Sequence, residues 1–194
     1  MLSKLNRFIV NCSESWWKIL LLFAGQFATL QGLSRITASF PAVSSGNIPF
    51  DMQNNLEPTQ VFEQLDGYTE QAFADYYLFQ AIDFAFPLFA GLFLATVCAF
   101  ALRHAAPRWY VVAVDRKLIL LLLLATVFDY LENLNFLWVV TTWPEPAELA
   151  AQLGVLAKKA KLTCMYTGFG VVALLLVGAA GRWVGIKTGL ISAR

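Results

Sequence analysis

Long apolar stretches alternate along the chain with shorter polar connections. Four of these stretches approach or exceed the roughly 20 residues that a helix needs to cross the hydrocarbon core of a bilayer. We therefore predict an all-α, polytopic membrane protein, a bundle of four transmembrane helices that forms a single membrane domain. The predicted spans cover residues 16–33, 78–102, 118–140 and 162–180 of the domain 1–194.

The first apolar stretch also has the length of a secretory signal peptide. Residues 37–39, with the sequence Thr-Ala-Ser, would then be its small-residue cleavage site. The start of the stretch argues against this, because Trp16, Trp17 and Lys18 are typical of a helix anchored at a membrane interface. We expect it to be a retained membrane helix.

The longest polar connection covers residues 34–76 and is strongly acidic. Its first part contains prolines and a glycine and predicts an extended loop. Pro58 can then begin a short amphipathic helix in which Val61 and Leu65 share one face. We expect this helix to lie over the mouth of the bundle, and Thr69 to cap the helix that leads into the second span.

Proline and glycine residues within the spans affect helix shape and packing. Pro87 follows Asp83 by four residues, and proline has no N–H to donate. The carbonyl group of Asp83 therefore loses its helical partner, and the helix should kink at this point. The kink either opens a cavity beside a buried acid or is an ordinary proline kink of a membrane helix. In the fourth span, Gly168 and Gly170 are expected to let neighbouring helices approach closely.

The third span carries polar residues at a depth where lipid is expected. In its sequence VFDYLENLNFLWVV, the spacing of Asp129, Glu132 and Asn133 places them on one face of a helix. Carboxylates inside a membrane are costly unless they face protein or water, so this stripe is a candidate functional site. The alternative is a buried polar network that only fixes the register of the helices.

Polar side chains of the other spans are expected at a similar depth. Asp83 should lie roughly 9 Å, and Glu132 roughly 12 Å, below the ends of their spans nearest the acidic loop. We therefore expect a water-accessible polar pocket beneath that loop. Its candidate ligand-binding residues are Asp83, Asp129, Glu132, Asn133, Asn135, Gln26, Tyr166 and Lys161.

Neighbouring carboxylates that are partly desolvated cannot all ionise, so at least one of these acids should be protonated near neutral pH. Such a group can act as a general acid, a proton carrier or a hydrogen-bond donor. Alternatively, Lys161 or Arg35 neutralises one acid as a structural ion pair. A hard cation held by three carboxylates is a further alternative.

The amino-acid composition argues against several classes of partner and site. Hydrophobic residues make up 58% of the chain, and the net charge is only +1, so membrane lipids are expected partners and nucleic acid is not. His104 is the only histidine, which argues against a histidine-based dyad or metal centre. Cys12, Cys98 and Cys164 lie far apart and indicate neither a disulfide framework nor a thiolate metal site. We predict no metal and no cofactor.

Four motifs follow one another between Pro49 and Asn135: FD, EPTQVFEQLDGYTEQAFADYY, IDFAFPLFAGLF and FDYLENLNF. This order resembles a widespread bacterial family of small four-span membrane proteins. The resemblance implies the four-span fold and the bacterial inner membrane, and it assigns no chemistry. The architecture alone is similar to sterol-isomerase-type four-helix proteins, which place carboxylates in a membrane cavity but differ in histidine content and spacing. The family resemblance is carried by Asp83, Pro87, Gly91, Asp129, Glu132 and Asn133.

Three functions fit these features. The first is a non-catalytic accessory protein or small-ligand-binding bundle, which could work with a membrane protein partner or as a homo-oligomer. The second is a lipid- or isoprenoid-modifying membrane enzyme that uses intramembrane carboxylates. The third is a proton- or cation-coupled transporter. A closed polar network would favour the first, an apolar chamber that ends on the acids the second, and a continuous path the third.

The basic residues predict the orientation of the chain. Ten of the 14 lysines and arginines collect on the side of the two termini, so the positive-inside rule places both termini in the cytoplasm. Reporter fusions should therefore place Asn54 and Pro146 outside, and His104 and Arg194 inside. A cytoplasmic signal from a fusion at Asn54 would overturn this topology. The ten residues are Lys4, Arg7, Lys18, Arg103, Arg108, Arg116, Lys117, Arg182, Lys187 and Arg194, and the other four are Arg35, Lys158, Lys159 and Lys161.

Overall fold

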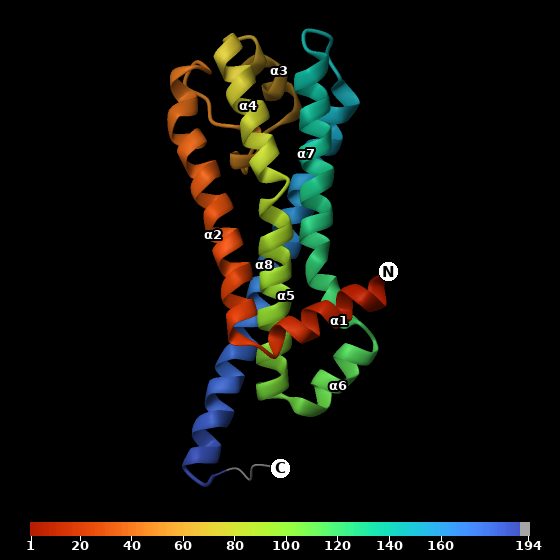
Figure 1. Cartoon of the computed structure of the whole chain (residues 1–194). Helices are drawn as coiled ribbons and strands as arrows, with labels where there is room; N and C mark the ends of the chain where they lie inside the picture. The colour runs from red at the N-terminus through yellow and green to blue at the C-terminus, as the bar shows by residue number, and fades with distance from the viewer. Residues whose placement is uncertain (191–194) are drawn as a thin grey trace.

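The computed structural model describes residues 1–190, which are all-α and contain no strand. Four helical segments of this part of the chain are long and apolar enough to cross a membrane, which confirms the predicted number of such helices. They run side by side as an elongated bundle (Figure 1). Arg194 lies outside the described residues. The bundle consists of α2 (Trp16–Ser39), α4 (Glu70–Asp83) with α5 (Phe86–Ala105), α7 (Leu124–Thr142) and α8 (Glu148–Lys187).

Helices α2 and α8 extend well beyond the predicted spans, whereas α7 begins only at Leu124, six residues after the predicted start of its span. Helix α8 has 40 residues, which corresponds to about 60 Å, twice the roughly 30 Å of a bilayer core. Its first turns stand beside the polar connections at one end of the bundle, and its last turns project beyond the other end (Figure 1). The predicted spans are shorter because hydropathy marks only the apolar part of a helix.

The helix break at Pro87 is present as predicted. Helix α4 ends at Asp83, residues 84–85 form a turn, and α5 begins at Phe86. The carbonyl oxygen of Pro87 accepts a hydrogen bond of 2.8 Å from the Thr126 hydroxyl group. The break is therefore tied to α7 one turn before the start of the acidic stripe.

Residues 40–69 form a cap on one end of the bundle, which we call the cap end. The predicted amphipathic helix is present as α3 (Pro58–Leu65), with Val61 and Leu65 buried. The predicted capping residue Thr69 accepts a hydrogen bond from the N–H of Ala72. The short 3₁₀ helices η1 (Phe40–Ala42) and η2 (Phe50–Met52) complete the cap.

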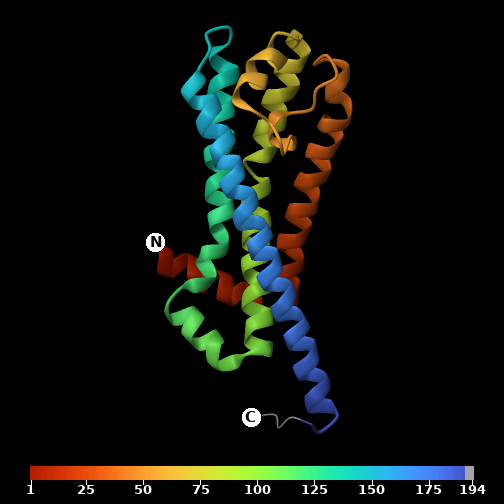
Figure 2. The same cartoon turned by 180° about the vertical axis from the view of Figure 1, so that it is seen from behind.

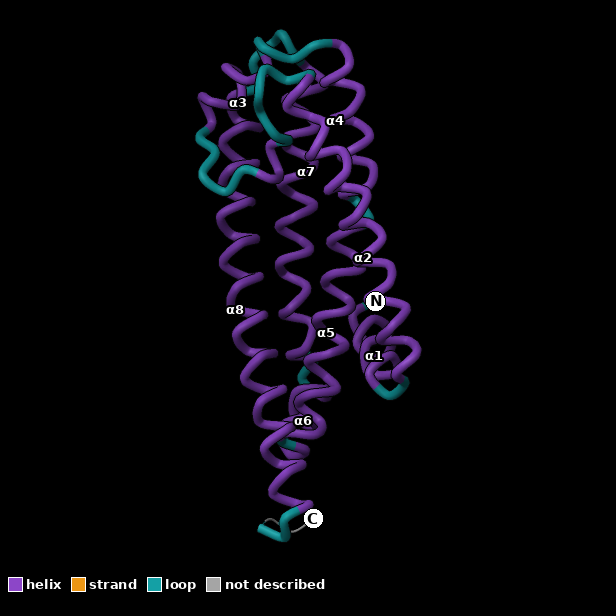
Figure 3. The backbone as a smooth tube through the Cα atoms, turned by 90° about the vertical axis from the view of Figure 1, so that its left-hand side faces the viewer, coloured by secondary structure: helices purple, strands orange, loops and turns teal. Residues whose placement is uncertain are grey.

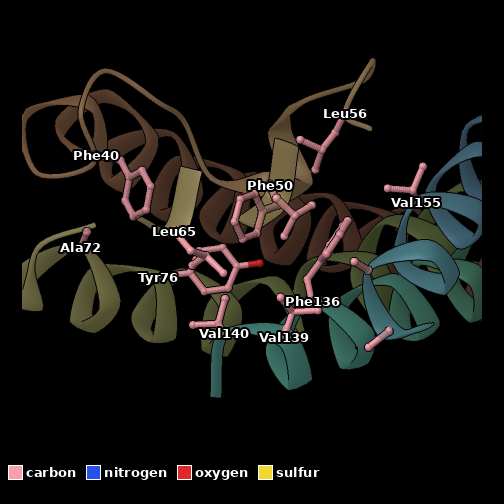
Figure 4. Close-up of a cluster of buried hydrophobic side chains, with 13 residues drawn as sticks. Phe40, Phe50, Leu56, Leu65, Ala72, Tyr76, Phe136, Val139, Val140 and Val155 are labelled. Carbon is pink, nitrogen blue, oxygen red and sulfur yellow. The ribbon is translucent and has the colours of Figure 1, made fainter. Parts of the chain in front are cut away.

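The largest hydrophobic core joins this cap to the bundle. The ring of Phe50 lies between those of Tyr76 and Phe136, with centroid distances of 5.4 and 5.6 Å (Figure 4). Phe40 and Leu56 are also buried in this cluster. Because Phe50 inserts between helices, the cap is part of the core as well as a cover over the bundle.

Two surface helices that the hydropathy pattern does not predict lie toward the opposite end, which we call the basic end. Helix α1 (Leu2–Ser13) crosses the bundle, and α6 (Pro107–Asp115) lies in the connection between the second and third spans (Figures 1 and 3). The side-chain amide of Asn6 donates to the carbonyl oxygen of Val114 at 3.0 Å. Arg103 donates to the carbonyl oxygen of Ser13 at 2.9 Å, so side-chain hydrogen bonds tie α1 to both α5 and α6.

Glycine packing follows the prediction only in part. A Cβ atom at Gly91 would overlap the Thr126 hydroxyl group, and one at Gly168 would lie 3.1 Å from Leu122. Gly170 has no neighbouring atom within 4 Å of such a Cβ. The expectation that Gly170 is a packing position is wrong, because it lies about 200° around the helix from Gly168.

This difference gives a stability prediction. Gly91→Ala should lower the free energy of unfolding by roughly 1–3 kcal/mol, because the added methyl group displaces Thr126 from its hydrogen bond. Gly170→Ala should be neutral or stabilising by up to about 1 kcal/mol, because alanine favours helix and meets no neighbour. Thermal unfolding of both variants in the same detergent is the measurement. An equal loss of stability in the two variants would contradict the packing of α5 on α7.

Candidate functional site

The acidic stripe of α7 faces the interior, as its helical spacing predicts. Asp129 is 8% exposed, and Glu132 and Asn133 are fully buried. Helix α8 packs antiparallel along α7, with α4 and α5 as the other neighbours of α7 (Figure 2). The stripe therefore points at protein and away from the surface that lipid would cover.

Two lysines of α8 form ion pairs with the acids of α7. The ammonium nitrogen of Lys158 lies 2.8 Å from Oε1 of Glu132. Lys161 forms an ion pair with Oε2 of Glu132 and a second, 3.4 Å contact with Oδ1 of Asp129. The Glu132 carboxylate thus sits between two ammonium groups, held by proximity of charge, since neither of its oxygens has an aligned hydrogen bond.

Lys158 is a site residue that the sequence analysis missed. The hydropathy pattern placed it with the charges outside the fourth span, yet its side chain is fully buried. Its ammonium group also donates to the carbonyl oxygen of Phe50 at 2.7 Å and lies 5.6 Å from the ring centre of Phe136. The spacing of the charges could have revealed this role. Lys158 and Lys161 are three residues apart, like Asp129 and Glu132, and such pairs can face each other on antiparallel helices.

Asp51, in the cap, is the second site residue that was missed. Its Oδ2 accepts a hydrogen bond of 2.8 Å from Gln80 and one of 3.1 Å from the hydroxyl group of Tyr76. Its Oδ1 is buried without a partner. Burial and the charge of Asp51 raise the pKa of the neighbouring Tyr68. The acid of the FD motif is therefore half-buried and bonded to α4, although it lies in the cap.

Asp83 and Asn133 lie between these groups without strong partners. Asp83 is 5% exposed and forms no ion pair within residues 1–190. The charges that act on it are those of Asp51, Asp129 and Lys161. Both polar atoms of the Asn133 amide are buried and unpartnered.

We call the six charged residues of this region the ionic cluster: Asp51, Asp83, Asp129, Glu132, Lys158 and Lys161. Four carboxylates and two ammonium groups leave a formal excess of two negative charges when all are ionised. The predicted ion pair with Lys161 is present, whereas Arg35 is exposed and forms no ion pair with a described residue. Protonation of one acid stays a prediction that this excess charge motivates. Within residues 1–190 no group of three acidic, cysteine or histidine side chains is placed to hold a metal ion.

Two of the eight predicted site residues point elsewhere. Tyr166 is 61% exposed on the outer surface of α8. Asn135 is half-buried and donates to the carbonyl oxygen of Leu131 on its own helix at 2.6 Å. Asn135 is about 200° around α7 from Asn133, and Tyr166 is about 140° around α8 from Lys161, so neither shares the helix face that carries the ionic cluster.

A pocket of about 130 Å³ opens directly beneath the ionic cluster, on the side toward the basic end. Asp129, Lys161 and the predicted residue Gln26 form its polar part, and Oε1 of Gln26 is buried without a partner. The helix break supplies one wall through Pro87 and Gly91. The remaining lining is mostly apolar and comes from α5, the 3₁₀ segment η3 (Leu118–Leu123), α7 and α8, including Phe93, Leu94, Leu122, Ala125, Met165 and Phe169.

Comparison of the chain with protein-family models, with curated proteins and with solved structures finds no match. The functional argument therefore depends on the geometry of the site.

Proposed function

We propose that this protein is a non-catalytic membrane bundle that binds a small amphiphilic ligand in the pocket beneath the ionic cluster. The observation that carries the proposal is the polar end of this pocket. Gln26 lines the pocket beside the Asp129–Lys161 ion pair, and its buried amide oxygen has no partner among residues 1–190. An unpaired buried acceptor costs roughly 1–3 kcal/mol, so a ligand that donates to it would gain that free energy.

The side chains at the polar end of the pocket can bind one small polar group of a ligand, such as a hydroxyl group. Lys161 donates hydrogen bonds, Asp129 accepts them, and the amide of Gln26 can do both. A ligand hydroxyl group could donate to Gln26 or Asp129 while it accepts from Lys161. Binding sites for small molecules typically combine apolar walls with a few convergent polar groups of this kind.

The ligand would reach the pocket from the lipid. A volume of about 130 Å³ is too small for a whole drug-sized molecule, for which sites of roughly 300–1,000 Å³ are usual. Gln26 belongs to α2, which packs on α4 and α5, whereas Lys161 and Met165 belong to α8, which packs on α5 and α7. The polar head of the ligand would occupy the pocket, and its apolar part would extend between α2 and α8.

The second candidate is a lipid- or isoprenoid-modifying enzyme, and the same pocket favours it, because an apolar chamber that ends on an acid is what such chemistry needs. The binding function fits better. Glu132, the nearest carboxylate to Asp129 along α7, is engaged by Lys158 and Lys161 and is not part of the pocket lining. An acid–base pair across a substrate would need both carboxylates at the pocket.

A proton- or cation-coupled transporter is less consistent with the bundle. Transport needs polar groups or water along the whole path, since charge is costly in an apolar medium. On the side of Gln26 and Thr126 toward the basic end, the pocket wall is apolar, with Leu94 and Leu122 among its residues. The polar region is a pocket with one apolar end and no polar continuation in that wall.

The membrane and its orientation belong to the same proposal. We place the protein in the bacterial inner (plasma) membrane with both termini in the cytoplasm, as the basic residues of the chain favour. The pocket would then lie in the outer leaflet under an extracytoplasmic cap. Membrane lipids would be its immediate partners, and an accessory role would add a membrane protein partner or a second copy of the chain.

Filling the pocket tests the proposal. The protein is purified in mild detergent, and the amphiphiles that remain bound are extracted and identified by mass spectrometry. Ala90→Phe should abolish retention of one such molecule at unchanged thermal stability, because Ala90 lines the pocket. Leu88→Phe is the matched control, since Leu88 is 46% exposed on the same helix and outside the pocket.

Equal amounts of every extracted amphiphile in the wild type, Ala90→Phe and Leu88→Phe would contradict the proposal. The enzyme alternative has its own signature. If Asp129→Asn accumulates a bound molecule that the wild type converts, so that the two extracts differ by a chemical modification, the acid is catalytic and the binding function is replaced by the enzyme.

A further inference from the structure

A second and larger pocket lies near the basic end of the bundle. Its volume is about 610 Å³, within the roughly 300–1,000 Å³ of ligand sites. Helix α5 forms its floor with Cys98 and Leu102, and α6 with the 3₁₀ segment η3 (Leu118–Leu123) forms one side. Helix α8 forms the other side through residues such as Val171 and Leu175. We call this pocket the basic-end groove.

The lining of the basic-end groove is suited to hydrocarbon. No charged residue lines it, in contrast to the pocket beneath the ionic cluster. Its hydroxyl groups are already satisfied, because Thr163 donates to the carbonyl oxygen of Lys159 at 2.9 Å and Thr167 to that of Thr163 at 2.8 Å. A ligand that entered this groove would find apolar contacts and little to hydrogen-bond.

The rim of the groove is positively charged. Arg108 directly precedes the lining residue Trp109, and Arg116 and Lys117 directly precede the lining residue Leu118. All three basic side chains are exposed, and within residues 1–190 none of them forms an ion pair. The exposed Asp115 is the acidic neighbour on this rim, so the rim carries a net charge of two positive units.

We propose that the basic-end groove binds one acyl chain of an anionic phospholipid, whose phosphate group is held by Arg108, Arg116 and Lys117. Charge complementarity selects this occupant, because an apolar groove with a cationic rim matches a molecule with a hydrocarbon chain and an anionic head. Guanidinium groups bind phosphate oxygens through two hydrogen bonds at once, which favours arginine at such a rim. The basic-end groove adjoins the pocket beneath the ionic cluster, since Leu122 lines both, but its proposed occupant does not depend on the function proposed for that pocket.

The preference of the protein for an anionic over a zwitterionic lipid tests the proposal directly. Native mass spectrometry of the full-length protein gives the apparent Kd of the first bound lipid. The probes are phosphatidylglycerol and phosphatidylcholine with the same acyl chains. The wild type should prefer phosphatidylglycerol, and the triple variant Arg108→Gln, Arg116→Gln and Lys117→Gln should lose about fivefold or more of that preference.

Two further variants separate a built site from diffuse surface charge. Thr167→Trp places a large side chain in the groove without changing any charge, and it should weaken phosphatidylglycerol binding by a similar factor. The double variant Lys4→Gln and Arg7→Gln removes basic residues of α1 that do not flank the groove. It should leave the preference within about twofold of wild type, because no residue of α1 lines the groove and neither charge adjoins a lining residue.

Three results would overturn the proposal. The first is equal binding of the two lipids to the wild type. The second is an equal loss of preference per removed charge in the rim and α1 variants, which would indicate surface electrostatics alone. The third is unchanged binding in a folded Thr167→Trp protein, which keeps all native charges and so remains informative even if the triple rim variant does not fold.

Discussion

The fully buried carboxylate of Glu132, between the ammonium groups of Lys158 and Lys161, is the contact on which the arrangement of the helices depends. Removing one partner of a buried ion pair costs several kcal/mol, because the remaining charge cannot return to water. This carboxylate therefore fixes the register of α7 against α8. A shift by one residue along either helix would separate the charges.

Lys158 also links the ion pairs of α7 and α8 to the cap. Lys158 donates to the carbonyl oxygen of Phe50, whose ring fills the space between Tyr76 and Phe136 (Figure 4). Asp51, the next residue, binds Tyr76 and Gln80 on α4. Two adjacent cap residues thus link α4, α7 and α8, so the polar contacts and the hydrophobic core at this end of the bundle support one another. Lys161 and Asp129, which line the pocket beneath the ionic cluster, belong to this same network.

The sequence predicted the features that local patterns encode. Four apolar stretches, the amphipathic helix at Pro58, the cap at Thr69 and the break before Pro87 each follow from residue type and spacing within a few turns. The spacing of Asp129, Glu132 and Asn133 gave their common face in the same way. These features could be predicted because each depends on residues that are close together in the sequence.

What the sequence could not predict depends on contacts between distant segments. Lys158 is buried because Glu132 and the Phe50 carbonyl group meet it, and neither is near it in the chain. Asp51 is half-buried and bonded to Tyr76 and Gln80 of α4, which lie far from it in the chain. Tyr166 was predicted to face the pocket but lies on the outer surface of α8, since hydropathy leaves the rotation of a helix open.

The most direct test of this account is the thermal and denaturant stability of Glu132→Gln in detergent. The variant should lose roughly 3–5 kcal/mol, because Lys158 and Lys161 then lack their shared carboxylate. Adding Lys158→Met to it should restore part of the loss, and Glu148→Gln, at an exposed acid of α8, should have no effect. A Glu132→Gln protein as stable as the wild type would show that Glu132 is already neutral, and would contradict an ionised carboxylate at the centre of the fold.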